Sequence, residues 1–248
     1  HLEKLIGVVP FGLPDTPPSH TKKVLKGVVP RITKDDSVVV WSGGIYDWFD
    51  PLTLIQAVAQ LAESRPSVKL FFMGTAHPHP GVPEMPIIKK ARELAAELGV
   101  SGTHVFFNDS WVDYDERQNY LLEADIGVST HRSHIETTFS FRTRILDYLW
   151  ASLPMVVTEG DHFADLVEKH GLGITVPAAD TQALVDALEH ALFDAEFRSS
   201  ATQALAVVRE SYRWSEVLKP LVSHVEGLAA VTIPTKATRI RYSPARKR

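Results

Sequence analysis

Two arginines and an aspartate stand close together in the stretch SFRTRILDYL, at the expected start of a helix. Asp147 follows Arg144 by three residues, which places both side chains on one helical face. A helix N-terminus presents free N–H groups and a positive dipole end, and guanidinium groups donate forked hydrogen bonds that suit phosphate. Arg142 and Arg144 therefore predict a bound anion here, with Asp147 able to accept hydrogen bonds from a diol. The alternative is a salt bridge between Arg144 and Asp147, with Arg142 solvated.

A pair of glycines, Gly43 and Gly44, opens the loop that follows the first buried-looking run. Glycine has no side chain to hold a ligand away, so such a pair lets the backbone approach a phosphate closely, although ordinary turns use glycine pairs as well. The loop matches neither the P-loop pattern nor the GxGxxG fingerprint. Trp48 and Phe49 in the same loop predict either a stacking surface for a ring or a domain interface.

Histidines in two later loops raise the question of a metal site. His77 and His79 stand in one loop, and His131 and His134 stand in another. A metal site needs further ligands, and no carboxylate stands at a recognisable spacing from the first pair. The chain has no cysteine, which excludes disulfides and thiolate ligands. We therefore expect no metal site and no cofactor.

Six short, nearly all-apolar runs alternate with helical patterns and must position these loops. Such runs are typical of strands buried on both faces, and the alternation predicts an α/β fold: a Rossmann-like, doubly wound parallel sheet of about six strands with extra C-terminal helices. Ligands bind outside the carboxyl ends of such strands. The expected strands are 38–41, 69–73, 104–107, 125–129, 154–157 and 173–176. The expected helices are 51–63, 85–99, 116–125, 141–152, 162–171, 181–192, 196–212 and 215–230, the last two packed back on the sheet.

Composition indicates a globular chain and sets the expected domains. The 248 residues are 44% hydrophobic and 23% charged, and the net charge of −4 argues against a general nucleic-acid binder. We expect a leading strand and linker at 1–20, a Rossmann-like domain at 21–235 and a basic tail at 236–248. The tail holds six basic residues and no acidic one. It could contact an anionic membrane surface, and a solvated disordered end is the simpler interpretation.

Taken together, these segments resemble a known family. The chain is similar to the C-terminal, donor-binding half of a retaining glycosyltransferase of the GT-B fold, in the group 1 or family 4 class. The resemblance covers about residues 6 to 225 and rests on VVPFG, VVVWSGGIYDWFDPLTLIQAV, KLFFMG, YLLEADIGVSTHR and above all FSFRTRILDYLWASLPMVVTEGD. The late segment YRWSEV resembles the tryptophan-containing stretch where such chains often turn back towards the first domain.

The resemblance implies a nucleoside-diphosphate-sugar donor bound by the domain at 21–235. The diphosphate would lie over Gly43 and Gly44 and the helix start, the ribose would face Asp147, and the base would lie against the backbone at Trp111 and Val112. The expected catalytic residues are Arg142, Arg144 and Glu136. The expected donor-binding residues are Gly43, Gly44, Trp48, Trp111, Val112, Phe139, Ser140, Phe141 and Asp147.

The sequence departs from the family pattern in three ways. Gly44 and Phe49 stand where the family has an arginine and a lysine, so Arg142 and Arg144 are expected to supply the missing charge. Phe139 stands where the first acidic residue belongs, and Glu136 is expected to take its role through a longer loop. The N-terminal domain that normally holds the acceptor and a catalytic histidine has no counterpart in the given sequence.

The resulting prediction is a hexosyltransferase half that moves a sugar from a nucleoside diphosphate to an acceptor in glycan or cell-envelope polysaccharide synthesis, inactive without its acceptor domain. The expected partners are the nucleotide sugar and a glycan or lipid-linked acceptor, with no nucleic acid. We expect a cytoplasmic protein, with the basic tail as a contact for the inner face of the membrane. The alternatives are a sugar-nucleotide epimerase lobe and a non-catalytic binding domain that kept the fold.

Overall fold

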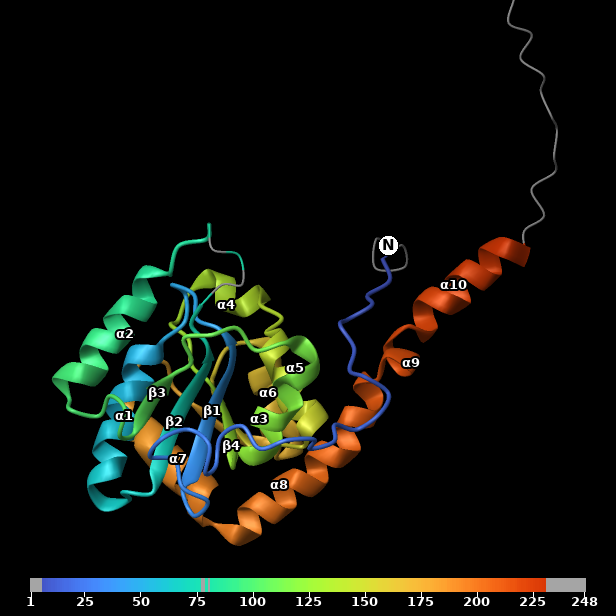
Figure 1. The fold of residues 1–248 in the computed structure, drawn as a ribbon. Helices are drawn as coiled ribbons and strands as arrows, with labels where there is room; N and C mark the ends of the chain where they lie inside the picture. The colour runs from blue at the N-terminus through green and yellow to red at the C-terminus, as the bar shows by residue number, and fades with distance from the viewer. Residues whose placement is uncertain (1–5, 77–78, 80, 231–248) are drawn as a thin grey trace, which may run out of the picture.

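A six-stranded parallel sheet forms the centre of the computed structural model, which describes residues 6–76, 79 and 81–230 (Figure 1). Every strand pair is parallel, and the strand order is β3-β2-β1-β4-β5-β6. The predicted doubly wound sheet and all six predicted strands are confirmed. The strands are β1 (Ser37–Gly44), β2 (Val68–Gly74), β3 (Val105–Phe107), β4 (Ile126–Ser129), β5 (Met155–Thr158) and β6 (Gly173–Val176).

Helices cover both faces of this sheet, as the alternation of patterns predicts. The main helices are α1 (Pro51–Ser64), α2 (Pro86–Glu97), α3 (Arg117–Glu123), α5 (Thr143–Ala151), α6 (His162–His170), α7 (Thr181–Phe193), α8 (Ala195–Val208) and α10 (Lys219–Ala230). Shorter ones are η2 (Tyr114–Glu116), α4 (Ile135–Phe139), η3 (Arg209–Tyr212) and α9 (Trp214–Val217). The sequence pattern did not predict α4, because its five residues are too few to show a helical period.

Alternate residues of each strand face two separate hydrophobic cores. In β1, Val39 and Trp41 pack against α1, α2 and α7, whereas Val38 and Val40 pack against α3, α5 and α6. A strand with both faces covered is apolar at most positions, which is why the six runs show no regular alternation of polar residues.

Aspartates begin four of the helices and so fix where the loops end. The side chains of Asp50, Asp161, Asp180 and Asp194 each accept a hydrogen bond from a backbone N–H in the first helical turn. An N-cap of this kind contributes about 1 kcal/mol to helix stability. The loops between strand ends and helix starts are therefore short and well placed.

The strand order reverses direction between β1 and β4, the two central strands. Their helices lie on opposite faces, so the loops at their carboxyl ends separate and leave a crevice, which is the usual ligand site of a doubly wound sheet. Gly43 and Gly44 are the last residues of β1, where the loop after it begins, and the loop after β4 leads through α4 to Arg142, directly before α5, and to Arg144 in its first turn.

The two ends of the chain differ from the sequence prediction. Residues 6–20 contain no strand, and Leu13 forms only an isolated bridge with Arg213. Leu205 of α8 packs into the hydrophobic core on one face of the sheet, as expected. In contrast, α10 extends away from the sheet (Figure 1), and its residues Leu221, Val222 and Val225 are exposed. Three parts of the chain for which the sequence analysis made predictions lie outside the described residues: residues 1–5, His77 and the basic tail at 236–248.

Among the described helices, none has both the length and the apolar character that a membrane crossing requires. The domain boundaries at residues 20 and 235 stay predictions.

Candidate functional site

Two adjoining grooves lie at the carboxyl ends of the strands, and the loop after β1 separates them. The first, here the β2 groove, has a volume of about 320 Å³ and lies between that loop, the end of β2 and residues 82–88 and 111–112. The second, here the α5 groove, has a volume of about 520 Å³ and lies between the same loop, the start of α5 and residues 11–14. Gly43, Gly44, Tyr46, Arg117 and Asp147 line both grooves.

The glycine pair allows two backbone segments to approach closely at the end of β1. Gly43 has a φ of 74°, in the left-handed region that favours glycine. A Cβ atom on Gly74, at the end of β2, would lie 2.7 Å from the carbonyl oxygen of Gly43. Tyr148 of α5 reaches the same strand, and its hydroxyl accepts a hydrogen bond from the backbone N–H of Ser42 at 3.1 Å. The loop after β1 is therefore held in place from two sides and presents backbone to the grooves.

Arg144 contacts this glycine loop as a buried cation. Its Nη2 donates to the carbonyl of Gly44 at 2.6 Å, and its guanidinium carbon lies 4.2 Å from the ring centroids of Trp41 and Phe49. Within the described part of the chain, Nη1 is buried without a hydrogen-bond partner, and Arg144 forms no ion pair. Burial lowers the pKa of Arg144 to about 10, because removal from water disfavours the charged form. At neutral pH Arg144 still carries a positive charge, and the charge of Asp147 acts on it only through space, without an ion pair among the described residues.

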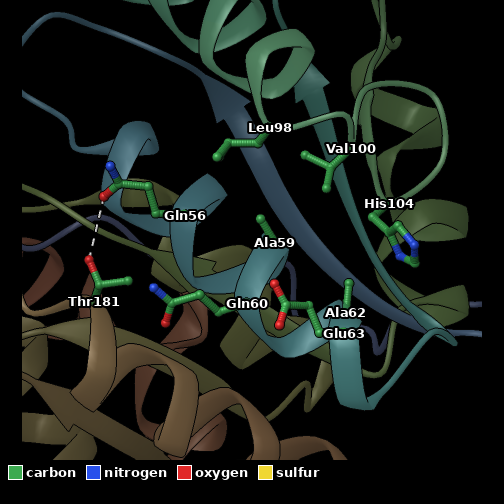
Figure 2. Close-up of a pocket in the computed structure, with 9 residues that line it drawn as sticks. All are labelled: Gln56, Ala59, Gln60, Ala62, Glu63, Leu98, Val100, His104 and Thr181. Carbon is green, nitrogen blue, oxygen red and sulfur yellow. Dashed lines mark hydrogen bonds between the residues drawn. The ribbon is translucent and has the colours of Figure 1, made fainter.

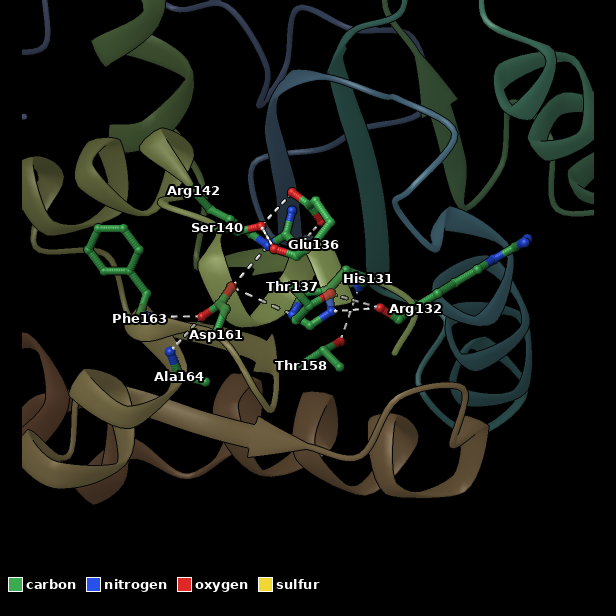
Figure 3. Close-up of polar contacts among 10 residues, drawn as sticks. All are labelled: His131, Arg132, Glu136, Thr137, Ser140, Arg142, Thr158, Asp161, Phe163 and Ala164. Carbon is green, nitrogen blue, oxygen red and sulfur yellow. Dashed lines mark hydrogen bonds and ion pairs between the residues drawn. The ribbon is translucent and has the colours of Figure 1, made fainter. Parts of the chain in front are cut away.

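Arg142, two residues earlier, is in a different electrostatic situation (Figure 3). Its Nε donates to Oδ2 of Asp161 at 2.9 Å, and its Nη2 donates to Oε2 of Glu136 at 3.2 Å. Arg142 and Asp161 are almost fully buried, so this is an interior ion pair rather than a surface contact. The sequence pattern predicted a bound anion beside the two arginines. For Arg142, the anions in contact with it are carboxylates of the protein itself, those of Asp161 and Glu136. A role for Arg142 towards a diphosphate stays a prediction.

Asp161 ties this arginine to the start of α6. Its Oδ1 accepts hydrogen bonds from the backbone N–H groups of Phe163 and Ala164, and Nε2 of the buried His131 lies 3.5 Å from its Oδ2. Burial acts to raise the pKa of Asp161, but the contact with His131, the hydrogen bond from the backbone of Ala164 and the charge of Arg142 outweigh it and hold the pKa below its ordinary value. Asp161 therefore stays ionised and fixes the loop after β4 against the loop after β5.

Glu136 stands at the wall of the α5 groove with its side chain 44% exposed. It accepts a hydrogen bond from the hydroxyl of Ser140, and this bond together with the charge of Arg142 lowers the pKa of Glu136. The sequence brings it there through the short helix α4, which begins one residue before it. Glu136, which was predicted to replace the family's first acidic residue, thus lines the groove as a partly exposed carboxylate.

Asp147 pairs with a residue that the sequence analysis did not identify. Nε of Arg117 donates to Oδ1 of Asp147 at 3.0 Å, whereas the expected alternative, a salt bridge with Arg144, is not formed. The reason is geometric: Arg144 points beneath the glycine loop, and Arg117 reaches Asp147 from α3. No local pattern could have indicated Arg117, because thirty residues separate the pair along the chain.

Aromatic side chains form the outer walls. The rings of Tyr46 and Trp48 stack with centroids 4.8 Å apart, and Trp48 is half-exposed in the α5 groove. Phe49 is buried edge-on against Trp41, so it packs in the domain's own core, which is neither of its two predicted roles. Trp48 keeps the role of an accessible ring.

The remaining predicted residues divide between the grooves and the surface. Trp111 and Val112 line the β2 groove, and Ser140 and Phe141 line the α5 groove. Phe139 is 81% exposed and lines neither of them, because α4 turns its side chain outward. Residues 11–14, expected in a linker, and Trp214 also line the α5 groove.

Two further observations bear on where chemistry is to be sought. No group of three or more potential metal ligands occurs among the described residues. A separate groove of about 560 Å³ runs along the outer side of α1, between α2 and α7 (Figure 2). The described side chains that line this groove are mostly small or uncharged, and Glu63 is the one carboxylate among them. Neither a lysine nor an arginine is among these described side chains.

Known structures share this fold. Sucrose-phosphate synthase from Thermosynechococcus elongatus aligns with a TM-score of 0.70 and 18% identity, over 90% of this chain and 52% of that one. HepE from Anabaena, solved in complex with UDP and glucose, aligns with a TM-score of 0.65 and 17% identity, over 78% of this chain and 49% of that one. The C-terminal domain of a group 1 glycosyl transferase (LpcC) from Francisella tularensis aligns with a TM-score of 0.59 and 17% identity, over 72% of this chain and 87% of that one.

The chain therefore spans about half the length of the first two proteins and most of the isolated C-terminal domain. No curated protein matches its sequence. A family model described as "Glycosyl transferases group 1" matches residues 36–194, which include every strand of the sheet and both arginines at the start of α5. The chain belongs to the group 1 glycosyltransferases.

Proposed function

We propose that this chain is the donor-binding half of a retaining glycosyltransferase, which moves a sugar from a nucleoside diphosphate to an acceptor in glycan or cell-envelope synthesis. The observation that carries the proposal is the buried guanidinium of Arg144 beneath the glycine loop, which has a nitrogen without a hydrogen-bond partner and forms no ion pair among the described residues. A charge in the interior costs free energy unless an anion is close to it. A diphosphate over Gly43 and Gly44 would supply that anion at the crevice where a doubly wound sheet binds ligands.

The other residues of the grooves support a nucleotide sugar as the whole ligand. The nine-residue helix α5 directs its free N–H groups towards the α5 groove, which favours phosphate. In this proposal Asp147 accepts hydrogen bonds from the ribose diol, and the base lies in the β2 groove against Trp111 and Val112. The transferred sugar lies in the α5 groove beside Glu136. Two proteins of the same fold, HepE and a pneumococcal O-GlcNAc transferase, were solved with UDP.

The chemistry assigned to this half is stabilisation of the leaving group. As the bond between the sugar and the diphosphate breaks, negative charge grows on the departing phosphate oxygen. Donors already aimed at that oxygen, here Arg144 and the N–H groups of α5, bind the transition state more tightly than the ground state. The acceptor would come from the other half of a two-lobed protein, and the anomeric configuration would be retained.

One observation favours a second candidate, a binding domain without turnover. Arg142 is already paired with Asp161 and Glu136, so only one of the two arginines at the helix start has charge left for a ligand. A domain of this kind would still bind the nucleotide but would leave its bond to the sugar intact. An epimerase lobe would act on the same ligand, and product analysis separates it from a transferase.

The test is a thermal-unfolding and calorimetric panel on the 248-residue chain with UDP, GDP, dTDP and ADP at millimolar concentration. A ligand at 100 times its Kd adds about 2.7 kcal/mol to the stability of the folded state, a shift of a few degrees. We expect one nucleoside diphosphate to raise the melting temperature and its parent nucleoside, which lacks phosphate, to bind much more weakly. Equal binding of the nucleoside, or binding of none of the four diphosphates, would reject the proposal.

A further inference from the structure

Arg117 is held rigidly in the wall between the two grooves, although it belongs to no motif. It opens α3, is 8% exposed, and lines both grooves. Its Nη1 donates to the carbonyl of Tyr114 at 2.6 Å, and its guanidinium carbon lies 3.5 Å from the centroid of the Tyr114 ring and 4.4 Å from that of Trp150. Contacts with two rings and a hydrogen bond to a backbone carbonyl hold the guanidinium in place, and its Nε points at Asp147.

Asp147 receives this hydrogen bond on one oxygen and keeps the other for a ligand. Oδ1 lies 3.0 Å from Nε of Arg117, and no other side-chain hydrogen bond to Asp147 occurs in the described part of the chain. Its side chain is 28% exposed and lines both grooves. A carboxylate held through Oδ1 offers Oδ2 in a fixed direction, as two adjacent hydroxyl groups require.

The surroundings of Asp147 oppose its ionisation unless a cation is close. Burial raises the pKa of Asp147, and the charge and hydrogen bond of Arg117, followed by the charge of Arg144, act in the opposite direction. The other titratable groups that line the two grooves are the phenols of Tyr46 and Tyr114, the carboxylates of Glu84 and Glu136, and the guanidinium of Arg142, and none of them forms a hydrogen bond or ion pair with Asp147. Arg117 is thus the nearest compensating charge for a carboxylate in a partly dry site.

We propose that Arg117 is a positioning residue of the nucleotide site: it orients Asp147 and keeps it ionised, so that Asp147 accepts hydrogen bonds from the ribose hydroxyl groups. The inference rests on the proposed function and adds a residue to it. Arg117 itself touches no ribose oxygen in this arrangement. Its effect on binding therefore passes entirely through the carboxylate.

The experiment compares two ligands and three chains by calorimetry. The ligands are UDP and its dideoxy analogue, which lacks both ribose hydroxyl groups. The chains are the wild type, Arg117→Met, which keeps the stem between the two rings without charge, and Arg117→Lys, which keeps the charge. The affinity of each chain for each ligand is measured from about pH 5 to about pH 8, a range in which carboxylates with raised pKa values titrate. Thermal unfolding of each chain checks that it is folded.

We expect Arg117→Met to lower UDP affinity about tenfold at pH 7, the size of one hydrogen bond to a charged group, and to leave the affinity for the dideoxy analogue unchanged. In this variant the loss of UDP affinity on acidification should begin at higher pH than in the wild type, because the carboxylate protonates earlier. Arg117→Lys should restore most of the UDP affinity and the wild-type pH profile.

Three results would overturn the inference. Equal losses for UDP and the dideoxy analogue would assign Arg117 a merely structural role. An unchanged UDP affinity and pH profile in Arg117→Met would remove its link to Asp147. A wild type that binds no nucleoside diphosphate at all would reject the proposed function, and the inference with it, whereas the first two results leave the proposed function standing.

Discussion

At the scale of single residues, charge balance distinguishes the two arginines of the helix start. Arg142 has carboxylates on two sides, from Asp161 and Glu136, and its charge stabilises the loops around it. Arg144 contacts two aromatic rings and a backbone carbonyl instead, and it forms no ion pair in the described part of the chain. A buried group that costs stability is often one that a ligand completes. The two arginines should therefore respond differently to removal.

The first prediction concerns Arg144→Met, which replaces the guanidinium by an apolar side chain of similar length. We expect the affinity for the nucleoside diphosphate to fall about tenfold or more, since a hydrogen bond to a charged group contributes about 1.5–3 kcal/mol. We expect the free energy of unfolding not to fall, because the variant no longer buries an unpaired cation. Calorimetry and urea unfolding measure the two quantities.

Arg132→Met is the matched control, because Arg132 is exposed and lines neither groove. It removes one positive charge close in sequence to α4 and should leave both quantities unchanged. Equal losses of affinity in both variants would mean that general charge, rather than the position of Arg144, attracts the ligand.

At the scale of elements, one aspartate joins two helices. Asp161 caps α6 through the N–H groups of Phe163 and Ala164 and pairs with Arg142, which directly precedes α5. Because both helices begin at the carboxyl edge of the sheet, this pair sets the spacing of the loops that line the α5 groove. Asp161 therefore stabilises the fold in two ways, through its charge beside Arg142 and through its cap on α6. Substitutions that remove the charge alone, or both the charge and the cap, separate the two contributions.

The second prediction concerns Asp161→Asn, which keeps a side chain that caps helices well but removes the charge. We expect a loss of about 3–5 kcal/mol in unfolding free energy at pH 7, because Arg142 is left buried with a weaker partner. The folded-state pKa of Asp161 lies below its unfolded value of about 3.9. Its ionic contribution is therefore present above that pH and is lost as the pH falls through the folded-state pKa.

The difference between wild type and Asp161→Asn should accordingly be large at neutral pH and shrink below about pH 4, as urea unfolding at several pH values would measure. Asp161→Ala should cost about 1 kcal/mol more at every pH, since it also removes the cap. A difference that does not change with pH would show that the ion pair contributes nothing to stability.

At the scale of the whole molecule, the segment around Leu13 near the N-terminus is hydrogen-bonded to the segment 212–214 near the C-terminal end of the domain. Leu13 and Trp214 share a backbone hydrogen bond of 2.9 Å, and Leu13 donates to the carbonyl of Tyr212 at 2.7 Å. Gly12 lies so close to Trp214 that a Cβ atom there would be 2.6 Å from Cδ2 of the indole. The chain thus closes on itself beside the α5 groove, and the segment expected to be a linker forms part of its wall.

The third prediction follows from that close approach. Gly12→Ala should lower the unfolding free energy by about 1–3 kcal/mol, the usual cost of overpacking, because the methyl group displaces the indole of Trp214. The matched control is Gly7→Ala, where an added Cβ meets nothing within 4 Å. Thermal unfolding gives the energy, and hydrogen exchange of the Leu13 and Trp214 amides reports whether the segment detaches. Unchanged exchange in Gly12→Ala would show that the indole moves without cost.

The sequence by itself determined the layers, the strands and the edge of the sheet at which to look. Runs such as 38–41 and 69–73 are apolar because both faces of a parallel sheet are covered, and that burial is visible in the order of residue types. Gly43, Gly44, Arg144 and Asp147 were found from the sequence for the same reason: the chain direction in a doubly wound sheet places them at its carboxyl edge.

Only the tertiary structure decided which charges remain free. Arg117 and Asp147 are thirty residues apart, and Arg142 and Asp161 are nineteen apart, so neither pair leaves a local pattern. Side-chain partners depend on rotamers and on how neighbouring helices pack, and these are set by contacts distant in sequence. A periodicity shows that a residue is buried or at a helix start. It does not show whether the partner of a buried charge is a carboxylate of the protein or must come from a ligand.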